Sequence, residues 1–248
     1  MRVIARLDIK GPNVVKTVST EGLRVVCDPA ILAKKYYDQS IDELVYIDIV
    51  ASLYQRNLDF DQLKAISQNV FIPITAGGGI RSLNDITMAL AAGADKVAIN
   101  TYAIRDPEFL REAAEKFGSQ CIVLSVEAKK IGEGEWEAYT DGGREKTGVD
   151  VLEWITRGIE LGVGEILLTS VDRDGTKKGY DTELIQAIAA ISPVPVIAHG
   201  GAGNAGDIFV AKTAGADAVS ASSVYHYNLI SIPQTKEFLG ARGVMIRI

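Results

Sequence analysis

The sequence predicts a single α/β domain, a closed (β/α)8 barrel built of two equivalent halves. Two observations carry this prediction. Short apolar runs alternate with longer amphipathic segments, and the whole pattern repeats at half length. The chain has 248 residues, 47% of them hydrophobic and 23% charged, which is the composition of a globular protein. At this length, eight strand-helix units favour a TIM barrel over an open sheet.

The apolar runs predict eight strands, at residues 3–8, 44–49, 71–75, 96–100, 121–126, 166–170, 194–198 and 216–220. Their near-continuous apolar character indicates a parallel sheet that is covered on both faces. Amphipathic segments between the runs predict helices, among them residues 28–37, 82–92, 106–117 and 149–161. Several of these segments begin with Asp or Ser, the residues that cap helix N-termini. Residues 130–147 are expected to form a long loop after the fifth strand, an excursion of the chain that helps to cover the site.

The internal repeat links segments far apart in the chain. Three pairs of segments are offset by 122 or 123 residues: Gly93 with Gly215, Glu43 with Glu165, and Gly77 with Gly200. This period is too long for a solenoid unit, so it indicates two half-barrels within one domain. We expect the domain to span residues 1–248 and the halves about 1–120 and 121–248.

Composition and charge exclude several classes of function. The net charge of −6 argues against a nucleic acid partner. No apolar run reaches the length that a bilayer needs, so we expect no membrane association and a cytoplasmic location. Two Cys and two His are too few for a zinc cluster, and no dinucleotide fingerprint or P-loop occurs. We therefore expect neither a metal nor a cofactor.

Acidic residues are predicted at the carboxyl ends of strands, where barrels of this kind carry their active sites. Asp8 is expected to end the first strand and Glu127 the fifth, so the repeat places two carboxylates at equivalent positions of the barrel mouth. Two carboxylates with different pKa values can donate and accept protons across one substrate. Solvated strand ends or ion-pair partners are the alternative interpretation of these side chains.

Glycine runs follow the third and seventh predicted strands, at residues 77–79 and 200–201. Each run precedes a helix, where backbone N–H groups can bind a phosphate without cationic side chains. The ends of the next strands extend the two sites with Asn100 and Thr101, and with Ser222 and Ser223. The pattern favours a substrate with two phosphates, although a tight turn also explains either glycine run.

These motifs resemble the HisF family, the cyclase subunits of imidazole glycerol phosphate synthase. The similar stretches are LDIK from Leu7, DELVYIDIVAS from Asp42, GGGI from Gly77, GADKVAINT from Gly93, FGSQ from Phe117, GEILLTSVDRDGTKKGYD from Gly164 and GGAG from Gly200. Together they cover nearly the whole chain. The run TSVDRDGTKKGYD is more similar to this family than to the related HisA isomerases, which share the barrel and both phosphate sites.

The resemblance implies a reaction and a partner. Ammonia, made from glutamine by a HisH-like glutaminase subunit, would pass through the barrel and attack a bisphosphorylated ribulosyl imine. The products would be imidazole glycerol phosphate and an aminoimidazole carboxamide ribonucleotide. The expected assembly is a heterodimer of barrel and glutaminase.

The resemblance also implies roles for individual residues. Asp8 and Glu127 would be the general acid/base pair, with Lys16 on a mobile first loop. One phosphate would be bound by Gly79, Asn100 and Thr101, the other by Asp174, Gly175, Gly201, Ser222 and Ser223, while Asp48 and Thr169 line the mouth.

At the opposite end of the barrel, the resemblance implies a charged ring through which ammonia enters, formed by Arg2, Glu43, Lys96 and Glu165. The repeat supports this placement independently, because Glu43 and Glu165 begin the second and sixth strands. A structural ring of ion pairs that closes the core is the alternative interpretation.

Three departures from the family pattern fall within the expected site. Glu127 stands where the family has a second Asp, residues 10–13 read Lys-Gly-Pro-Asn, and His199 replaces a small serine beside the second phosphate site. Two other functions therefore stay open. A HisF-like paralogue would pass ammonia to a sugar amidotransferase in acetamidino-sugar synthesis for surface polysaccharides. A catalytically silent barrel would act only as a scaffold or activator of the glutaminase.

Overall fold

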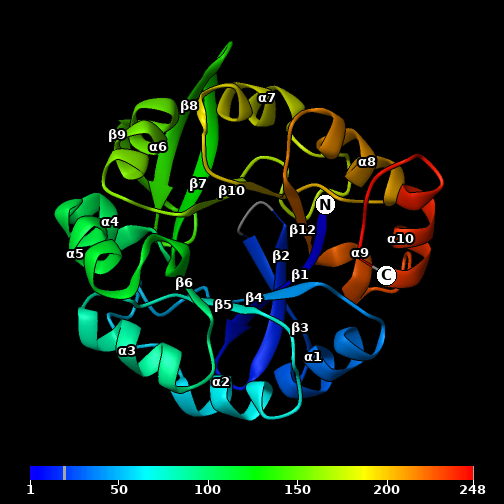
Figure 1. Ribbon diagram of the computed structural model, residues 1–248, viewed down its shortest axis with the longest axis horizontal. Coiled ribbons are helices and arrows are strands. Elements are labelled where there is room, and N and C mark those ends of the chain that lie inside the picture. The colour runs from blue at the N-terminus through cyan, green and yellow to red at the C-terminus, as the bar shows by residue number, and fades with distance from the viewer. Residues whose placement is uncertain (19–20, 248) are drawn as a thin grey trace.

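A closed barrel of parallel strands forms the centre of the computed structural model, which describes residues 1–18 and 21–247 (Figure 1). The barrel strands are β1 (Arg2–Lys10), β4 (Glu43–Asp48), β5 (Ile74–Gly77), β6 (Lys96–Ile99), β7 (Ile122–Gly132), β10 (Glu165–Ser170), β11 (Val196–His199) and β12 (Ala218–Ala221). They pair in the order β10-β11-β12-β1-β4-β5-β6-β7, and β7 pairs with β10 to close the sheet. The predicted (β/α)8 barrel is confirmed.

Helices surround the barrel as an outer ring (Figure 1). They are α1 (Pro29–Asp38), α2 (Phe60–Ser67), α3 (Leu83–Ala91), α4 (Thr101–Arg105), α5 (Glu108–Phe117), α6 (Val151–Glu160), α7 (Thr182–Ile191), α8 (Ala205–Thr213), α9 (Ser223–His226) and α10 (Ile232–Gly240), with a short 3-10 turn at Ser119–Cys121. The side chains of Asp28 and Ser82 accept hydrogen bonds from the first turns of α1 and α3, as expected of N-caps. Among the described residues, no helix has the length and apolar character needed to cross a membrane.

Three barrel strands begin two or three residues later than the sequence predicts. One is β12, which was expected at residues 216–220 and begins at Ala218. The other two are β5 and β11. We expected strands at residues 71–75 and 194–198, but β5 begins at Ile74 and β11 at Val196. Each follows a proline, Pro73 or Pro195, which has no N–H to donate to a neighbouring strand. The carbonyls of the two prolines accept equivalent hydrogen bonds, of 3.0 Å, from Leu44 N and Ile166 N.

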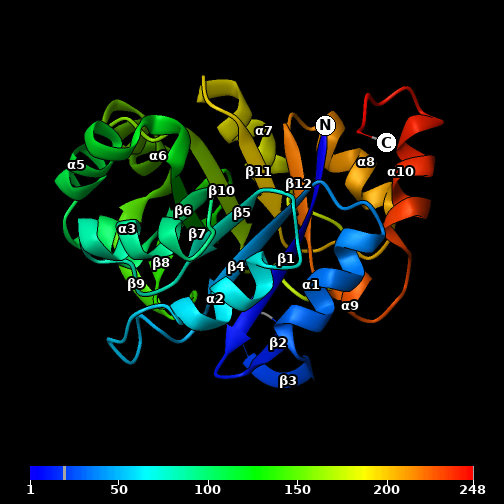
Figure 2. The same ribbon diagram turned by 60° about the horizontal axis from the view of Figure 1, so that its bottom comes forward.

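The first and fifth barrel strands run past the acidic residues at which we expected them to end. β1 continues beyond Asp8 by pairing with β2 (Asn13–Val18), which in turn pairs with β3 (Glu21–Cys27). β7 continues beyond Glu127 by pairing with β8 (Glu135–Thr140), which is followed by β9 (Glu145–Asp150). Figure 2 shows β2 and β3 at the end of the barrel opposite the N-terminus. Both carboxylates therefore lie within strands whose extensions fold over the mouth.

The barrel interior is layered along its axis. An apolar layer fills the middle, formed by Ile4, Val45, Ala98, Val123, Leu167, Ile197 and Ala218. Strand side chains alternate between faces, so residues two positions further along each strand lie in the next layer towards the mouth. Arg6 and Thr169 occupy that layer above Ile4 and Leu167. The mouth is therefore separated from the opposite end by a layer of apolar side chains.

Candidate active site

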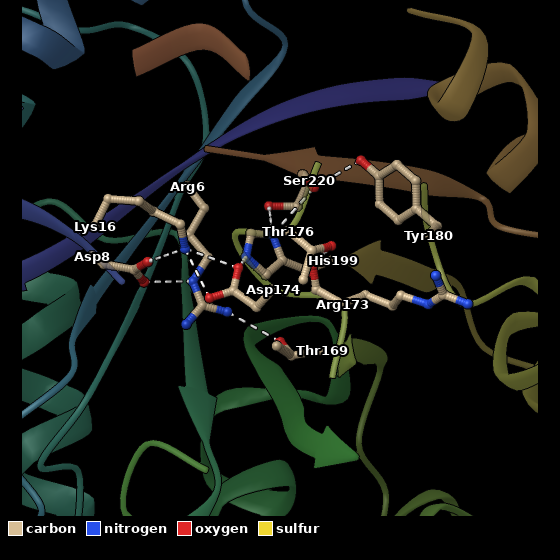
Figure 3. A network of polar contacts seen from close by, with 10 residues as sticks. All are labelled: Arg6, Asp8, Lys16, Thr169, Arg173, Asp174, Thr176, Tyr180, His199 and Ser220. Atoms are coloured by element: carbon tan, nitrogen blue, oxygen red, sulfur yellow. Dashed lines mark hydrogen bonds and ion pairs between the residues drawn. The ribbon is translucent and has the colours of Figure 1, made fainter. Parts of the chain in front are cut away.

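The two predicted carboxylates, Asp8 and Glu127, line one small cavity of about 30 Å³ together with Thr169. Asp8 accepts a hydrogen bond from Arg6 Nε at 2.7 Å and lies 3.4 Å from Lys16 Nζ (Figure 3). The Glu127 carboxylate instead accepts from two neutral donors, Asn100 Nδ2 at 2.9 Å and Gly143 N at 2.8 Å. Gly143 follows β8, so the excursion after the fifth strand does reach the site.

The surroundings separate the pKa values of the two carboxylates. Burial raises the pKa of Glu127 to about 7, against the opposing effect of the Arg6 charge and the Gly143 hydrogen bond. Burial also acts on Asp8, but the charges of Arg6 and Lys16 outweigh it and hold the Asp8 pKa below its usual value. Near neutral pH, the Asp8 carboxylate is therefore ionised, while the Glu127 carboxyl is close to its own pKa and can gain or lose a proton. This is the separation that acid/base catalysis by two carboxylates requires.

The N-terminal cradle, as we call the site formed by Asp48, Gly78, Gly79, Asn100 and Thr101, lines an open cavity of about 190 Å³. Gly78 and Gly79 have φ values of 96° and 75°, and a Cβ atom at either would lie within 2.4 Å of a backbone oxygen. Glycine is therefore required at both positions. The structure brings together the residues that we expected at the first phosphate site.

Besides Arg6, two cations that line the cavity of the N-terminal cradle were missed by the sequence reasoning, which considered amides and hydroxyl groups as phosphate ligands. Arg81 and Arg105 line the same cavity. Arg81 is held by the carbonyl of Gln55 at 2.8 Å and by the side chain of Asn57. Arg105 lies 3.6 Å from Asp141 and is more than half exposed. Arg105 follows Thr101 on α4, one turn along the helix, which is the signal that could have identified it.

The C-terminal cradle comprises Lys16, Asp174, Gly175, His199, Gly201, Ser222 and Ser223, which surround a cavity of only about 10 Å³. Lys16 Nζ lies at this cavity, 2.8 Å from both carboxylate oxygens of Asp174 (Figure 3). Gly201 has a φ of 106°, and a Cβ atom there would lie 2.1 Å from the carbonyl oxygen of Gly179. The predicted residues of the second phosphate site are together, and they leave only a small cavity.

Lys16 is not on a loop as we expected, because it lies in the middle of β2 and is buried. The ion pair with Asp174 connects the first hairpin to the segment that follows β10. Burial of the Asp174 carboxyl is outweighed by the charge of Lys16, which holds its pKa below the usual range.

His199, at the end of β11, faces the C-terminal cradle in its neutral form. Its Nδ1 lies 3.2 Å from the carbonyl oxygen of Ser220, which can only accept, so Nδ1 carries the proton. Burial, reinforced by the Arg6 charge, lowers the His199 pKa. Its Nε2 lies 3.4 Å from Asp174 Oδ1 without a hydrogen bond, and Ser222 Oγ also has no partner among the described residues.

The predicted charged ring lies at the opposite end of the barrel. Arg2 pairs with Glu43 at 2.7 Å and with Glu165, and Lys96 pairs with the same two carboxylates at 2.5 and 2.7 Å. Each cation bridges both acids, so the four side chains form one closed set of ion pairs. A role in admitting ammonia remains a prediction.

Arg6 was also missed by the sequence reasoning, although it contacts Asp8 directly. Its Nη1 donates to Thr169 Oγ1 at 3.1 Å, from β1 to β10 across the barrel interior (Figure 3). A charged residue in the middle of an apolar strand, two positions before an acid and on the same face, is the signal that could have identified it.

Within residues 1–18 and 21–247, no group of three or more His, Cys, Asp or Glu side chains is arranged to hold a metal ion. Cys27 and Cys121 are both free thiols.

Comparison with known proteins indicates the family. Residues 2–231 match the family described as histidine biosynthesis protein. The chain is 50% identical to imidazole glycerol phosphate synthase subunit HisF of Mycobacteroides abscessus, over 99% of this chain and 98% of that protein. It is 55% identical to the protein of the same name from Legionella pneumophila, over 82% of this chain and 96% of the relative. The relative from Helicobacter hepaticus, again with this name, is 48% identical over 100% and 98% of the two chains.

Proposed function

Because the chain belongs to the family of histidine biosynthesis proteins, as a HisF-type cyclase subunit of imidazole glycerol phosphate synthase, we propose how its barrel mouth carries out the cyclase reaction. The relatives reported above all carry the name of the cyclase subunit. The acetamidino-sugar paralogue and the silent scaffold are accordingly not favoured, and nothing supports a sugar amidotransferase as partner.

A synthase subunit implies a partner subunit. We propose a HisH-like glutaminase, bound at the end of the barrel that carries Arg2, Glu43, Lys96 and Glu165. Ammonia released there would pass the ring and the apolar layer on its way to the mouth. The location in the cytoplasm stays a prediction from the sequence.

The substrate is a small molecule with two phosphates, a ribulosyl imine, bound across the mouth. The N-terminal cradle supplies backbone N–H groups and a free cavity of about 190 Å³ for one phosphate. The C-terminal cradle would hold the other once Lys16 and Asp174 rearrange, since its cavity of about 10 Å³ is smaller than a phosphate. The reacting part of the substrate would lie between them, against Asp8 and Glu127.

The observation that carries this proposal is the cavity shared by one charged and one protonated carboxylate. To close an imidazole ring, the ammonia nitrogen must bond to two carbons. At the ribulosyl carbonyl carbon it replaces the oxygen, which leaves as water, and at the imine carbon it displaces the nitrogen that leaves with the aminoimidazole carboxamide ribonucleotide. In the displacement at the imine carbon, the attacking nitrogen must lose a proton and the departing nitrogen must gain one. Asp8, as the charged group, accepts the first proton, and Glu127 donates the second. No net proton is consumed by the pair once Asp8 and Glu127 exchange protons with solvent.

The test is turnover of the bisphosphate substrate by the purified chain alone, supplied with an ammonium salt so that no glutaminase is needed. We expect imidazole glycerol phosphate as product. The concentration of unprotonated ammonia is held constant between pH 7 and 9, so that any change of rate belongs to the protein. Tight binding of the substrate without product would contradict the proposal and favour a silent barrel.

A further inference from the structure

The Arg6 guanidinium touches only one of the two candidate catalytic carboxylates. Arg6 and Asp8 lie two positions apart on β1, so both side chains point into the barrel, and Nε donates to Asp8 Oδ1 at 2.7 Å. The hydrogen bond from Nη1 to Thr169 at 3.1 Å fixes the other side of the guanidinium on β10. Among residues 1–18 and 21–247, the donors within hydrogen-bond distance of the Glu127 carboxylate are neutral, the Asn100 amide and the Gly143 N–H.

We propose that Arg6 is the positioning residue that gives the two carboxylates opposite roles, because it holds Asp8 as the charged base and leaves Glu127 as the acid. This inference rests on the proposed function, in which the pair catalyses the cyclase reaction. Arg6 acts through the pair rather than on the substrate.

The charged groups around Asp8 single out Arg6 as its main partner. Besides Arg6, Asp8 faces Lys16 on β2, Asp174 after β10 and His199 on β11. Lys16 Nζ is 3.4 Å from Asp8 but 2.8 Å from both oxygens of Asp174, so its charge is already engaged. His199 is neutral. Without Arg6, burial would dominate and Asp8 would take up a proton more readily.

The Arg6 charge also lowers the pKa of Glu127, although the two side chains form no hydrogen bond. The charges that face it are Arg6 and Asp8 on β1 and Asp141 after β8. Arg6 is the cation among these charges, and Arg144, which also lines the small cavity, donates from Nη1 to the carbonyl oxygen of Asp141 at 3.3 Å. Removal of Arg6 therefore leaves the Glu127 carboxyl beside two acids without the cation whose charge lowers its pKa. The Glu127 pKa would then rise above about 7. Loss of Arg6 thus raises the pKa values of both carboxylates. The larger rise is expected at Asp8, which Arg6 contacts directly, so the difference between the two narrows.

The first measurement is the titration of the Glu127 carboxyl, which needs no turnover. The purified chain carries ¹³C-labelled carboxyl groups, and the Glu127→Gln variant assigns the signal. In Arg6→Gln we expect the midpoint of Glu127 to move upward by about half to one pH unit. Arg2→Gln, which removes a barrel cation from the opposite end, is the matched control and should leave this midpoint unchanged. An unmoved midpoint in Arg6→Gln would overturn the inference.

The second measurement is the pH profile of ammonia-driven turnover. The wild-type rate should fall as the pH rises through about 7, where Glu127 loses its proton. In Arg6→Gln the falling limb should move to higher pH, and a rising limb should appear as Asp8 titrates. Arg6→Lys keeps the charge and should restore the wild-type limbs at reduced amplitude. Arg6→Met, a second neutral variant of similar length, should move the limbs as Arg6→Gln does and carries the test if Arg6→Gln does not fold.

A purely structural role predicts a different result, a lower rate with both limbs unmoved, and this would overturn the inference. If the wild-type chain produces no imidazole glycerol phosphate, the proposed function fails. The carboxyl titration then still decides whether Arg6 sets the two protonation states.

Discussion

The N-terminal and C-terminal cradles have similar glycine-rich backbones but differ in how much free space they enclose. Each follows a barrel strand with glycines at positive φ, Gly78 and Gly79 in one and Gly200 and Gly201 in the other. The first surrounds a cavity of about 190 Å³, whereas the second leaves about 10 Å³ around Lys16 and His199. The repeat therefore duplicates the glycine-rich backbone, and the side chains determine how much space each copy leaves.

The two carboxylates differ in the same way. Asp8 and Glu127 occupy equivalent strands of the barrel and line one cavity. One is paired with cations and the other is buried beside neutral donors. A duplicated barrel provides two similar acids, and unequal neighbours give them different proton affinities.

The largest expected effect comes from removing the charged member of the pair. Asp8→Asn keeps the size of the side chain but cannot accept a proton from ammonia. Loss of a general base costs about 10²- to 10⁴-fold in rate. We expect turnover with ammonium salts to fall by this factor while the affinity for the bisphosphate substrate stays nearly unchanged.

Asp38→Asn, an exposed substitution at the end of α1, is the control and should leave both quantities unaltered. An equal loss of binding and turnover in Asp8→Asn would mean that Asp8 is a structural residue, and the comparison of the two carboxylates would lose its catalytic meaning.

The second prediction concerns the uncharged member and is measured as stability. Burial raises the pKa of Glu127 from 4.5 to about 7, so the folded state binds this proton more tightly than the unfolded chain. The resulting stabilisation is complete below pH about 4.5 and is lost as the pH rises through about 7. Glu127→Gln removes the titration but retains a hydrogen-bond acceptor.

Between pH 5 and pH 8, the free energy of unfolding of Glu127→Gln relative to wild type should therefore rise by about 2–3 kcal/mol. Urea unfolding at the two pH values measures it, and Glu112→Gln on the exposed face of α5 is the control. A constant difference between variant and wild type would show that Glu127 is already ionised at pH 5.

Much of the fold was accessible from the sequence because barrel strands are apolar throughout. Their order, the repeat and the N-caps at Asp28 and Ser82 all follow from local patterns. The starts of β5 and β11 were misplaced, since Pro73 and Pro195 act through a missing N–H. The hairpins were not predicted because β2 and β8 depend on pairing with extensions of β1 and β7.

The sequence predicted which residues form the candidate site, but not which ion pairs and hydrogen bonds they make. The repeat brought Asp8 together with Glu127 and located both glycine runs. It could not predict that Lys16 pairs with Asp174, 158 residues away, at the C-terminal cradle. Arg6 was missed for a related reason, because its position depends on a hydrogen bond to Thr169 across the barrel. Such pairings are set by three-dimensional packing rather than by sequence pattern.

A third prediction tests whether His199 controls the C-terminal cradle. The neutral ring presents an unprotonated Nε2 to this site, which repels an anion, so the protonated ring should bind an anion more tightly than the neutral one. Because burial lowers the His199 pKa, sulfate affinity at this cradle should decrease as the pH rises from 5.5 to 7.5, by up to about tenfold per pH unit. Sulfate is used because it does not itself titrate in this range.

Amide chemical shifts of Gly201 and Ser222 report this cradle, and those of Gly79 and Thr101 report the N-terminal one in the same titration. His199→Asn should abolish the pH dependence at the first pair of amides only. Equal sulfate affinity at both pH values in the wild type would mean that His199 does not contact the anion.

The smallest expected effect is at Arg105, whose charge reaches the open cradle from a largely exposed side chain. Water and salt screen such a charge, so its pairing with an anion contributes about 0.2–1 kcal/mol. Arg105→Gln should therefore weaken sulfate binding at the Gly79 and Thr101 amides by about two- to fivefold, and added sodium chloride should reduce the difference. Arg111→Gln, an exposed substitution on the neighbouring helix α5, is the control. A loss well above tenfold would mean that Arg105 leaves Asp141 and becomes buried against the anion, so that side-chain cations rather than backbone amides determine binding in the N-terminal cradle as well.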